Sequence, residues 1–527
     1  MAPPSSGQPS SSCSAKPSPP AISRPPGSPP RSATSTPRTG FLCAVCGSLR
    51  PSRVTCAAVA SLKLSAQPAH ISLARPRSAC NPRSMRFLLR ILPVLSCHSV
   101  LVLRVLAADA TSPASIAAAP PPRDWIDPDT RHRVIRLSPD QGGSSLYFHQ
   151  NGYTPEGDKL ILHTRDGALA TVNLTTLGLS PTKLEIVAPA TRAIATAWRT
   201  REAYVRRDGH IVALHLDTKA ERTVIKLPEV AQGRGGAYAL NCDESLLVGI
   251  ARDPDGKTIP RTPPTSGAGG TLEAQWAAGT PKMIYTIDVK TGAFRVIHRE
   301  NDWTNHLQCS PTDPLQILFC HEGPWHFNDR TWTVRADGTP ARLLHERTMN
   351  MEIEGHEFFS PDGKKIWYDL QTPRSTVFWL ANVDLTSGHR TWYSLKREEW
   401  SVHYNVSPDG KFFAGDGGGA GSVAASSGDG VRLDPPGNGQ WIYAFYPSPV
   451  RGSSFRDQRP LIDIGVLKSQ RLVNMANHNY SKDTGVEPNL TFTRDGKWLI
   501  FSGNFHTNPG HGQKATTHTY AVEIAKK

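Results

Sequence analysis

Residues 360–370 read SPDGKKIWYDL, and residues 407–416 read SPDGKFFAGD. Both stretches begin with Ser-Pro-Asp-Gly, continue through lysine and end in a short apolar segment. Proline at the second position and glycine at the fourth favour a tight turn between two strands. Altered copies of this phrase occur elsewhere in the chain, at residues 154–157, 241–244, 310–313 and 493–496. The repeated unit therefore predicts a turn followed by a buried strand.

The copies that begin at residues 310, 360, 407 and 493 are separated by 50, 47 and 86 residues, and the last interval equals two periods of 43. Between them lie pairs of alternating strands joined by short turns, such as IYTIDVKTGAFRVI from residue 284 and WLANVDLTSGHRTWYSL from residue 379. Four short strands in each 40–50 residues are typical of propeller blades. We predict an all-β, seven-bladed β-propeller with WD40-like blades, closed by pairing of the last strand, at residues 519–524, with strands near the start. A long sandwich or β-helix does not explain the period.

The charge of the chain is concentrated at its beginning. The 527 residues contain 59 Lys and Arg against 45 Asp and Glu, a formal net charge of +14. Residues 1–104 hold 13 of the basic residues and no acid, and the rest of the chain is close to neutral. A core that binds nucleic acid would show a basic face, so that function is not supported. No apolar run is long enough for a membrane protein of many spans.

Three segments are expected. Residues 1–84 are rich in Pro, Ser, Ala and Arg, which predicts a disordered low-complexity extension. Residues 85–108 combine a basic start at Met85, an apolar run and a small-residue exit, which resembles a secretory signal peptide. We therefore expect translation to begin at Met85 and residues 1–84 to be an artefact of start-site choice; an unusual pre-sequence or an apolar anchor is the alternative. The propeller would occupy residues 109–527 of a periplasmic or secreted protein, or of a cytoplasmic one if the signal-like segment is not used.

Histidines recur at one position of the repeat. His306, His356 and His403 each lie four residues before a copy of the turn. Equivalent positions in neighbouring blades form a ring around the central axis, where imidazoles could hold a divalent cation or act as a base. The alternative is that such a histidine only stabilises the turn.

The last copy of the turn adds oxygen ligands to this ring. Glu487 and Asn489 lie six and four residues before Thr493, and His478 is close in sequence. One carboxylate, one amide and imidazoles suit Mn²⁺, Mg²⁺ or Ca²⁺ better than structural zinc. His321, Glu322 and Arg330 are expected to face the channel and bind substrate, or, alternatively, Glu322 and Arg330 form a buried structural pair. G-x-S-x-G, Walker and dinucleotide-binding motifs are absent.

Several of these segments together resemble the oligogalacturonate lyases, seven-bladed propellers of pectin breakdown. The resemblance extends over roughly residues 130–525 and is carried by the following stretches: NDWTNHLQCSPTDP, FCHEGPWHFNDRTW, EGHEFFSPDGKKIWYDLQ, VHYNVSPDGKFFAGDGG, LVNMANHNY and EPNLTFTRDGKWLIF. It implies cleavage of short galacturonate chains by β-elimination, with Mn²⁺ as the metal and a histidine as the base.

The resemblance also implies roles for individual residues. His306 resembles the base of the family, and His356 resembles one metal ligand. The family's Gln-x-x-His-x-His block aligns with Thr484, Glu487 and Asn489, so His478 and His403 are expected to compensate for two replaced imidazoles. Where the family holds substrate with an arginine, this chain offers Lys282 and the neighbouring Met283. These departures imply a divergent member. Two alternatives stay open: a lyase that acts on another uronate polysaccharide, and a non-catalytic propeller that binds a protein or glycan.

Overall fold

The computed structural model describes residues 121–233, 236–262, 271–419, 422–427, 431, 441–450, 461–480, 486–505 and 516–526. By its internal contacts the chain divides into two units, residues 1–105 and 106–527, and every described residue belongs to the second. The expected disordered extension and the signal-like segment lie outside the described residues.

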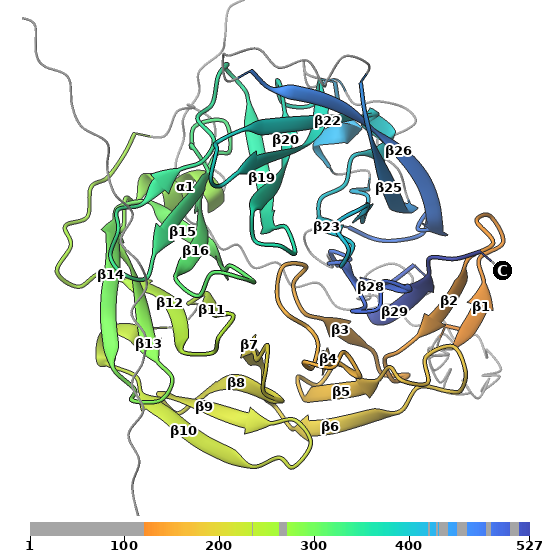
Figure 1. Ribbon diagram of the computed structural model, residues 1–527, viewed down its shortest axis with the longest axis horizontal. Helices are drawn as coiled ribbons and strands as arrows, with labels where there is room; N and C mark the ends of the chain where they lie inside the picture. Colours follow the sequence, from red (N-terminus) through yellow and green to blue (C-terminus); the bar gives the residue numbers. More distant parts are fainter. Residues whose placement is uncertain are drawn as a thin grey trace, which may run out of the picture. The chain divides into compact units, whose positions relative to one another are not determined.

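The described residues form six β-sheets arranged around a central axis (Figure 1). One sheet has eight strands and corresponds to two four-stranded blades, so the ring has seven blades. The prediction of an all-β, seven-bladed propeller is confirmed. Contacts between β7 and β11, β11 and β15, β15 and β19, and β23 and β27 show that the first strands of neighbouring blades lie next to one another.

Blades 1 to 4 each contain four antiparallel strands in chain order. Blade 1 comprises β3 (Gly143–Ser145), β4 (Lys159–Thr164), β5 (Leu169–Asn173) and β6 (Leu184–Ala188). Blade 2 comprises β7 (Ala193–Thr196), β8 (Glu202–Arg207), β9 (His210–His215) and β10 (Glu221–Lys226). Blade 3 comprises β11 (Tyr238–Leu240), β12 (Leu246–Arg252), β13 (Lys282–Asp288) and β14 (Phe294–Glu300). Blade 4 comprises β15 (Trp303–Cys309), β16 (Gln316–Glu322), β17 (Thr331–Arg335) and β18 (Arg342–Leu343).

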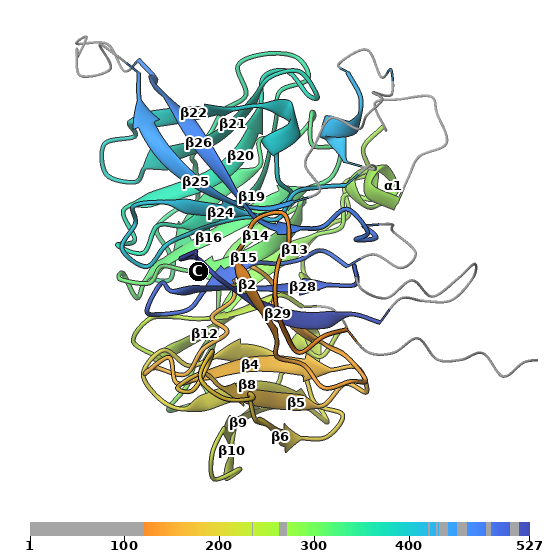
Figure 2. The same ribbon diagram turned by 90° about the vertical axis from the view of Figure 1, so that its right-hand side faces the viewer.

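Blades 5 and 6 share one sheet because β22 pairs with β26 in parallel. Blade 5 comprises β19 (Ile353–Phe359), β20 (Lys365–Gln371), β21 (Phe378–Asp384) and β22 (Arg390–Leu395). Blade 6 comprises β23 (Tyr404–Val406), β24 (Phe413–Gly415), β25 (Trp441–Pro449) and β26 (Asp463–Asn474). The long strands β25 and β26 run side by side toward one end of the molecule (Figure 2). The copies of the turn at residues 407 and 493 therefore enclose one long blade, and the expectation that their interval spans two periods of 43 is wrong.

Helices are few in the described residues. The α-helix α1 (Thr271–Ala277) lies between β12 and β13. There are also three short 3-10 helices, η1 (Glu229–Ala231), η2 (Arg397–Glu399) and η3 (Val423–Ala425). None of the helices in the described part of the chain has the length and apolar character that a membrane crossing needs. Strands and the loops between them therefore build the channel in the described residues.

The repeated turn joins the first two strands of a blade, as its sequence predicts. Gly363, Gly410 and Gly496 have φ values of 68°, 70° and 68°, a left-handed conformation that costs little without a Cβ atom. In each case the glycine N–H donates to the carbonyl of the first turn residue, at 2.8–2.9 Å. The turn aspartates accept from the hydroxyl of that same residue, at 2.6–2.7 Å. The turn is therefore stabilised from within each blade.

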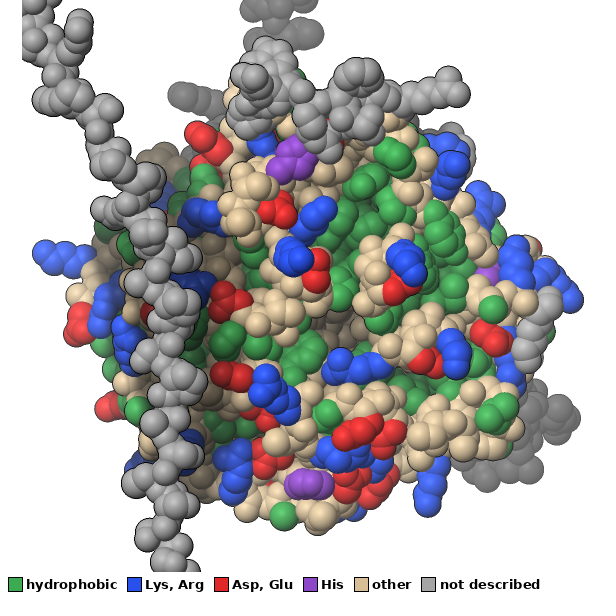
Figure 3. Space-filling view, in the orientation of Figure 1, with side chains coloured by type: hydrophobic (Ala, Val, Ile, Leu, Met, Phe, Trp, Pro, Cys, Tyr) green, Lys and Arg blue, Asp and Glu red, His purple; other side chains and the backbone are tan. Residues whose placement is uncertain are grey.

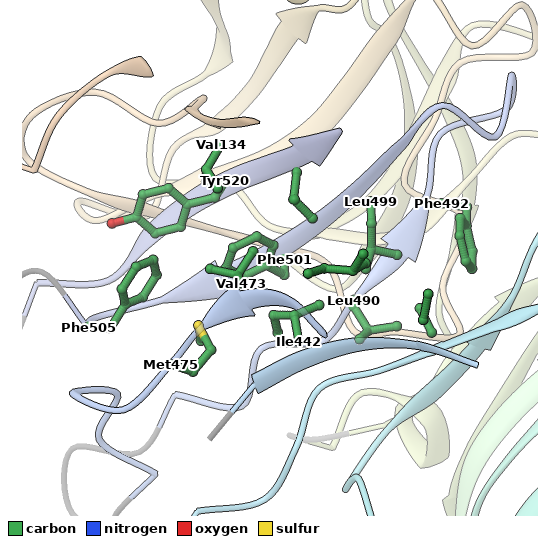
Figure 4. Packing of buried hydrophobic residues seen from close by; sticks show 14 residues of the cluster. Val134, Ile442, Val473, Met475, Leu490, Phe492, Leu499, Phe501, Phe505 and Tyr520 are labelled. Carbon is green, nitrogen blue, oxygen red and sulfur yellow. The ribbon is translucent and has the colours of Figure 1, made fainter. Parts of the chain in front are cut away.

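Blade 7 closes the ring with strands from both ends of the described chain. Its order is β1 (Asp124–Ile126), β2 (Arg133–Arg136), β29 (His518–Glu523), β28 (Trp498–Gly503) and β27 (Thr491–Phe492). Val134 and Tyr520 are fully buried, and they pack with Phe501, Leu499 and Val473 in one apolar cluster (Figure 4). The predicted pairing of the last strand with strands near the start is confirmed.

The surface of the propeller carries charges of both signs. In the face shown in Figure 3, basic and acidic side chains alternate around the rim, and hydrophobic side chains gather toward the hollow at the centre. This pattern agrees with the near-neutral composition of the chain after residue 104. On this face there is no continuous basic surface.

Candidate active site

Three blades present a side chain to the axis through the same backbone conformation. His306, His356 and Asn489 each lie four residues before the repeated turn, and their φ values are 47°, 48° and 51°. In β15 and β19 the strand pairing shifts at this point, between Asn305 and Gln308 and between Gly355 and Phe358. Such bulges redirect a side chain away from the regular alternation of a strand. The equivalence that the sequence predicts is therefore structural for His306, His356 and Asn489, whereas His403 does not have a positive φ.

His306, His356 and His403 form one group, which we call the histidine cluster. The ring centroids of His306 and His356 are 6.2 Å apart, and those of His356 and His403 are 4.7 Å apart. The loop between β3 and β4 reaches the same place (Figure 1). Its Tyr147 ring lies 5.5 Å from His306 and 5.2 Å from His403.

Two members of the cluster are held by buried carboxylates. Nδ1 of His356 lies 2.8 Å from Oδ1 of Asp369, and Nδ1 of His403 lies 2.7 Å from Oδ2 of Asp416. A carboxylate at Nδ1 fixes the tautomer and leaves the Nε2 lone pair for a ligand. Nε2 of His403 approaches the hydroxyl of Tyr147 at 3.2 Å.

Burial and the neighbouring charges shift the pKa values of these groups in different directions. Burial lowers the pKa of His356 well below its ordinary value, so this imidazole is neutral at pH 7. Burial raises the pKa of its partner Asp369 to about 7. Burial also opposes the charged form of His403, but the Asp416 carboxylate raises the pKa of this histidine on balance. His356 therefore has the properties of a metal ligand more clearly than His403.

His306 lies in a buried network of charges. Its Nδ1 is 3.1 Å from Oε1 of Glu357 and 3.2 Å from Nη2 of Arg330, and its Nε2 is 3.5 Å from Oε1 of Glu322. Arg330 is 2% exposed and pairs with both carboxylates at 3.1 Å. Two carboxylates thus flank His306, and a single guanidinium neutralises only one of their charges.

The pKa values of the two carboxyls follow from this pairing. Burial opposes their ionisation, but Arg330 holds the pKa of Glu357 well below its ordinary value and that of Glu322 below it. Both are therefore ionised when His306 is neutral. The structure shows Glu322 and Arg330 as the buried pair that the sequence left as the alternative. Arg330 also anchors the next blade, because its backbone N–H donates to Glu354 Oε1 at 2.8 Å.

The remaining predicted substrate residues lie apart from this network. Nε2 of His321 bonds Glu300 at 2.9 Å, and the same carboxylate oxygen lies 3.0 Å from His298. Lys282 begins β13, and burial lowers its pKa. Within the described part of the chain it forms no ion pair. The structure does not join His321 or Lys282 to the histidine cluster.

Of the predicted ligands near the last turn, Glu487 and Asn489 keep oxygen donors, whereas His478 does not have a free nitrogen. Glu487 reaches the cluster, with Oε2 3.7 Å from Nε2 of His403 and a side chain that is 57% exposed. Asn489 accepts the Phe148 N–H at 3.4 Å and donates to the Glu487 carbonyl at 2.9 Å. Both ring nitrogens of His478 are engaged by backbone groups: Nε2 lies 2.7 Å from the Val486 carbonyl, and Nδ1 accepts the Asn504 N–H at 3.2 Å. His478 thus has no free nitrogen for a metal ion, and Thr484 lies outside the described residues.

The donors of the cluster suit a cation of the kind expected, with His356 and His403 offering nitrogen and Glu487 and Asn489 oxygen. Among the described residues, the group of three donors that lies within 4.8 Å of one another is instead His306, Cys320 and Glu322. Burial raises the pKa of the Cys320 thiol well above its ordinary value, and Arg330 already neutralises Glu322. This second group is therefore less suited to a metal ion than the first.

Sequence reasoning missed Asp369, Asp416, Glu357 and Tyr147. A signal for the first two exists, because each lies 13 residues after its histidine, at the end of the strand that follows the turn. Glu357 and Tyr147 carry no comparable signal. They meet His306 and His403 only through the contact between blades.

A propeller whose channel holds buried histidine–carboxylate pairs beside a buried network of charges is compatible with an enzyme. Comparison with known sequences identifies the family: the profile described as oligogalacturonate lyase matches residues 123–511. The chain belongs to the oligogalacturonate lyase family. Membership of an enzyme family removes the alternative of a non-catalytic propeller.

Individual relatives show how far the chain has diverged. The oligogalacturonate lyase of Dickeya dadantii is 26% identical over 309 residues, which cover 58% of this chain and 72% of the relative. The oligogalacturonide lyase of Pectobacterium atrosepticum gives the same figures. Two solved structures share the fold. An oligogalacturonate lyase in complex with manganese has 21% identity and a TM-score of 0.57 over 76% of this chain and 96% of its own, and that from Vibrio parahaemolyticus has 20% and 0.58 over the same shares.

The buried position of Arg330 predicts a large effect on stability. Arg330→Met would leave Glu322 and Glu357 buried without the guanidinium that neutralises them, and we expect a loss of about 3–5 kcal/mol in the free energy of unfolding. Arg207→Met removes an exposed pair with Glu221 whose side chains are both 41% exposed, and should cost about 0–1 kcal/mol. Urea unfolding measures both. Equal losses in the two variants would contradict the buried network.

His478 predicts a pH dependence of stability. Burial lowers its pKa from 6.5 to about 4. Between these two pH values the unfolded chain binds a proton at His478 that the folded chain does not bind. The contribution of neutral His478 to the stability of the fold is therefore complete above pH 6.5 and declines as the pH falls toward 4. His478→Gln keeps a donor for the Val486 carbonyl and should remove about 2 kcal/mol of the stability difference between pH 7 and pH 5. The partly exposed His210, changed to Gln, should leave the slope unaltered.

Proposed function

We propose that this protein cleaves oligogalacturonate by metal-dependent β-elimination, with His306 as the base. The observation that carries the proposal is the setting of His306 between Glu357 and Glu322, beside two histidines held by carboxylates. Membership of the oligogalacturonate lyase family supports a pectin oligosaccharide as the substrate.

His306 is suited to accept a proton. Nδ1 can donate to Glu357 at 3.1 Å, which leaves the Nε2 lone pair free to take the C5 proton of a uronate. The imidazolium that forms lies between two ionised carboxylates and is stabilised by both. The C5–H electron pair forms the C4–C5 double bond as the C4–O4 bond breaks, and the departing O4 takes a proton.

The residues present fit a divalent cation. His356 would hold it through Nε2, supported by His403, Glu487 and Asn489, and this mixture of nitrogen and oxygen suits Mn²⁺, with Mg²⁺ and Ca²⁺ as alternatives. When bound, such an ion neutralises the uronate carboxylate and makes the adjacent proton more acidic. The manganese complex of a structural relative agrees with this choice. Asp369 would orient His356 whether or not substrate is present.

His306→Gln tests the base directly. The variant removes the proton acceptor but keeps side-chain polarity, and we expect turnover of trigalacturonate to fall about 10²–10⁴-fold. The rise in ultraviolet absorbance from the new conjugated double bond measures the rate. Mn²⁺ binding, followed by calorimetry, should persist. His210→Gln in blade 2 is the matched control, and normal turnover by His306→Gln would show that the base is another group.

Asp369→Asn tests the metal ligand. The amide can still contact His356 but no longer supports its tautomer by charge, so Mn²⁺ affinity should fall about 10–100-fold. Asp409→Asn, in the exposed turn of blade 6, provides the control because Asp409 is 50% exposed and lies outside the cluster. Titration with Mn²⁺ alone gives the result without reference to activity. Equal affinity in the two variants would remove His356 from the ligand set.

A further inference from the structure

The second position of the repeated turn deviates from proline in three blades. Ala197 takes the place of the first turn residue in blade 2, because its N–H donates to Glu202 at 3.0 Å as that of Ser360 donates to Lys365 at 2.8 Å. Around the ring the second position is therefore occupied by the following residues: Pro155, Trp198, Cys242, Pro311, Pro361, Pro408 and Arg494. The two large departures are a tryptophan and an arginine.

These two departures meet. The guanidinium carbon of Arg494 lies 5.5 Å from the centre of the Trp198 ring, and Nη2 of Arg494 donates to Oδ1 of Asn151 at 3.2 Å. The neighbouring acid of the turn, Asp495, pairs with Lys497 at 3.4 Å. Over the residues that the structure describes, Arg494 itself forms no salt bridge: the Glu156 carboxylate acts on its charge but pairs with Arg201. An arginine that rests on an indole face and forms no salt bridge is ready to bind an anion.

Trp198 and Arg494 line a cavity at this end of the channel. Its volume is about 460 Å³, and all seven blades contribute to its wall. Ligand pockets commonly measure about 300–1,000 Å³ and combine an apolar wall with a few polar groups. The amide nitrogens of Gln308 and Asn405 already donate to backbone carbonyls, at 2.7 and 3.0 Å, so these two side chains offer their oxygens as polar groups here.

The cavity is separate from the proposed metal ligands. Phe148 and His149, from the loop between β3 and β4, form part of its wall, and on the other side their rings lie 4.8 Å from His403 and 5.7 Å from His306. None of the histidine cluster lines the cavity. The loop thus stands between the cavity and the histidine cluster.

We propose that this cavity is a second uronate-binding site, which needs no metal ion. Arg494 pairs with the sugar carboxylate, the indole of Trp198 packs against the pyranose ring, and the amide oxygens of Gln308 and Asn405 accept from its hydroxyl groups. The choice of a uronate among anionic sugars rests on the proposed function. The binding chemistry, a carboxylate on a sugar ring, follows from the cavity itself.

The experiment uses the full chain treated with EDTA and D-galacturonate as the probe. Chelation removes any cation from the histidine cluster, so binding of D-galacturonate that remains must occur at a site that does not use a metal ion. Calorimetry should give one equivalent for the unaltered chain and weaker binding of D-galactose, which has no carboxylate. Absence of D-galacturonate binding in EDTA overturns the proposal.

Variants assign the binding to this cavity. Arg494→Gln keeps a donor for Asn151 but removes the charge, and it should weaken D-galacturonate binding about tenfold or more. Trp198→Leu should weaken D-galacturonate and D-galactose alike. Lys497→Gln removes a charge from the same turn outside the cavity and should change nothing. Melting temperatures establish that each variant is folded, and unaltered binding by Arg494→Gln overturns the proposal.

The result is independent of the lyase assay. Binding that depends on Arg494, in a chain that does not cleave trigalacturonate with Mn²⁺, would overturn the proposed function and retain this site. Cleavage of trigalacturonate by a chain without Arg494-dependent binding would retain the proposed function and overturn this site.

Discussion

The ring closes where β2 meets β29, and the geometry of the channel depends on that contact. Val134, Ile135 and Arg136 pair with Val522, Ala521 and Tyr520, which lie almost 400 residues away in the sequence. The same terminal segment also reaches blade 6, because Thr130 Oγ1 donates to the Leu472 carbonyl at 2.7 Å. A group of side chains that comes from several blades keeps its distances only if the ring is complete. Closure therefore positions the histidine cluster although no residue of β2 or β29 belongs to it.

Local sequence features predict the architecture, because each blade is built from interactions between near neighbours. The Ser-Pro-Asp-Gly turn, the alternating strands and the position four residues before the turn are all short-range patterns, and the structure follows them. The pairing of His356 with Asp369 is also local and is readable at a distance of 13 residues. The positive φ of His306 and His356 also occurs at a position that the sequence marks, four residues before the turn.

Contacts between blades are what the sequence did not reveal. Arg330 in blade 4 meets Glu357 in blade 5, and Tyr147 from blade 1 meets His403 from blade 6. No spacing connects these residues, since the ring sets their distance. His478 is a second example. Its place in the sequence predicts a metal ligand, but its two nitrogens contact the Val486 carbonyl and the Asn504 N–H, which come from other segments of the chain. Proximity in sequence to a site does not determine which way an imidazole points.

The balance of charge explains why the proposed base and the proposed cation would belong to the same site. Glu322 and Glu357 are ionised and only Arg330 opposes them, so the network carries one excess negative charge while His306 is neutral. That excess repels a uronate carboxylate. Coulomb repulsion between unit charges a few ångströms apart is strong in a buried site of low dielectric constant. A substrate anion can approach this base only if positive charge is placed beside it. His356, held neutral by burial with Nε2 free, is the group in the cluster best able to hold that charge as a bound cation.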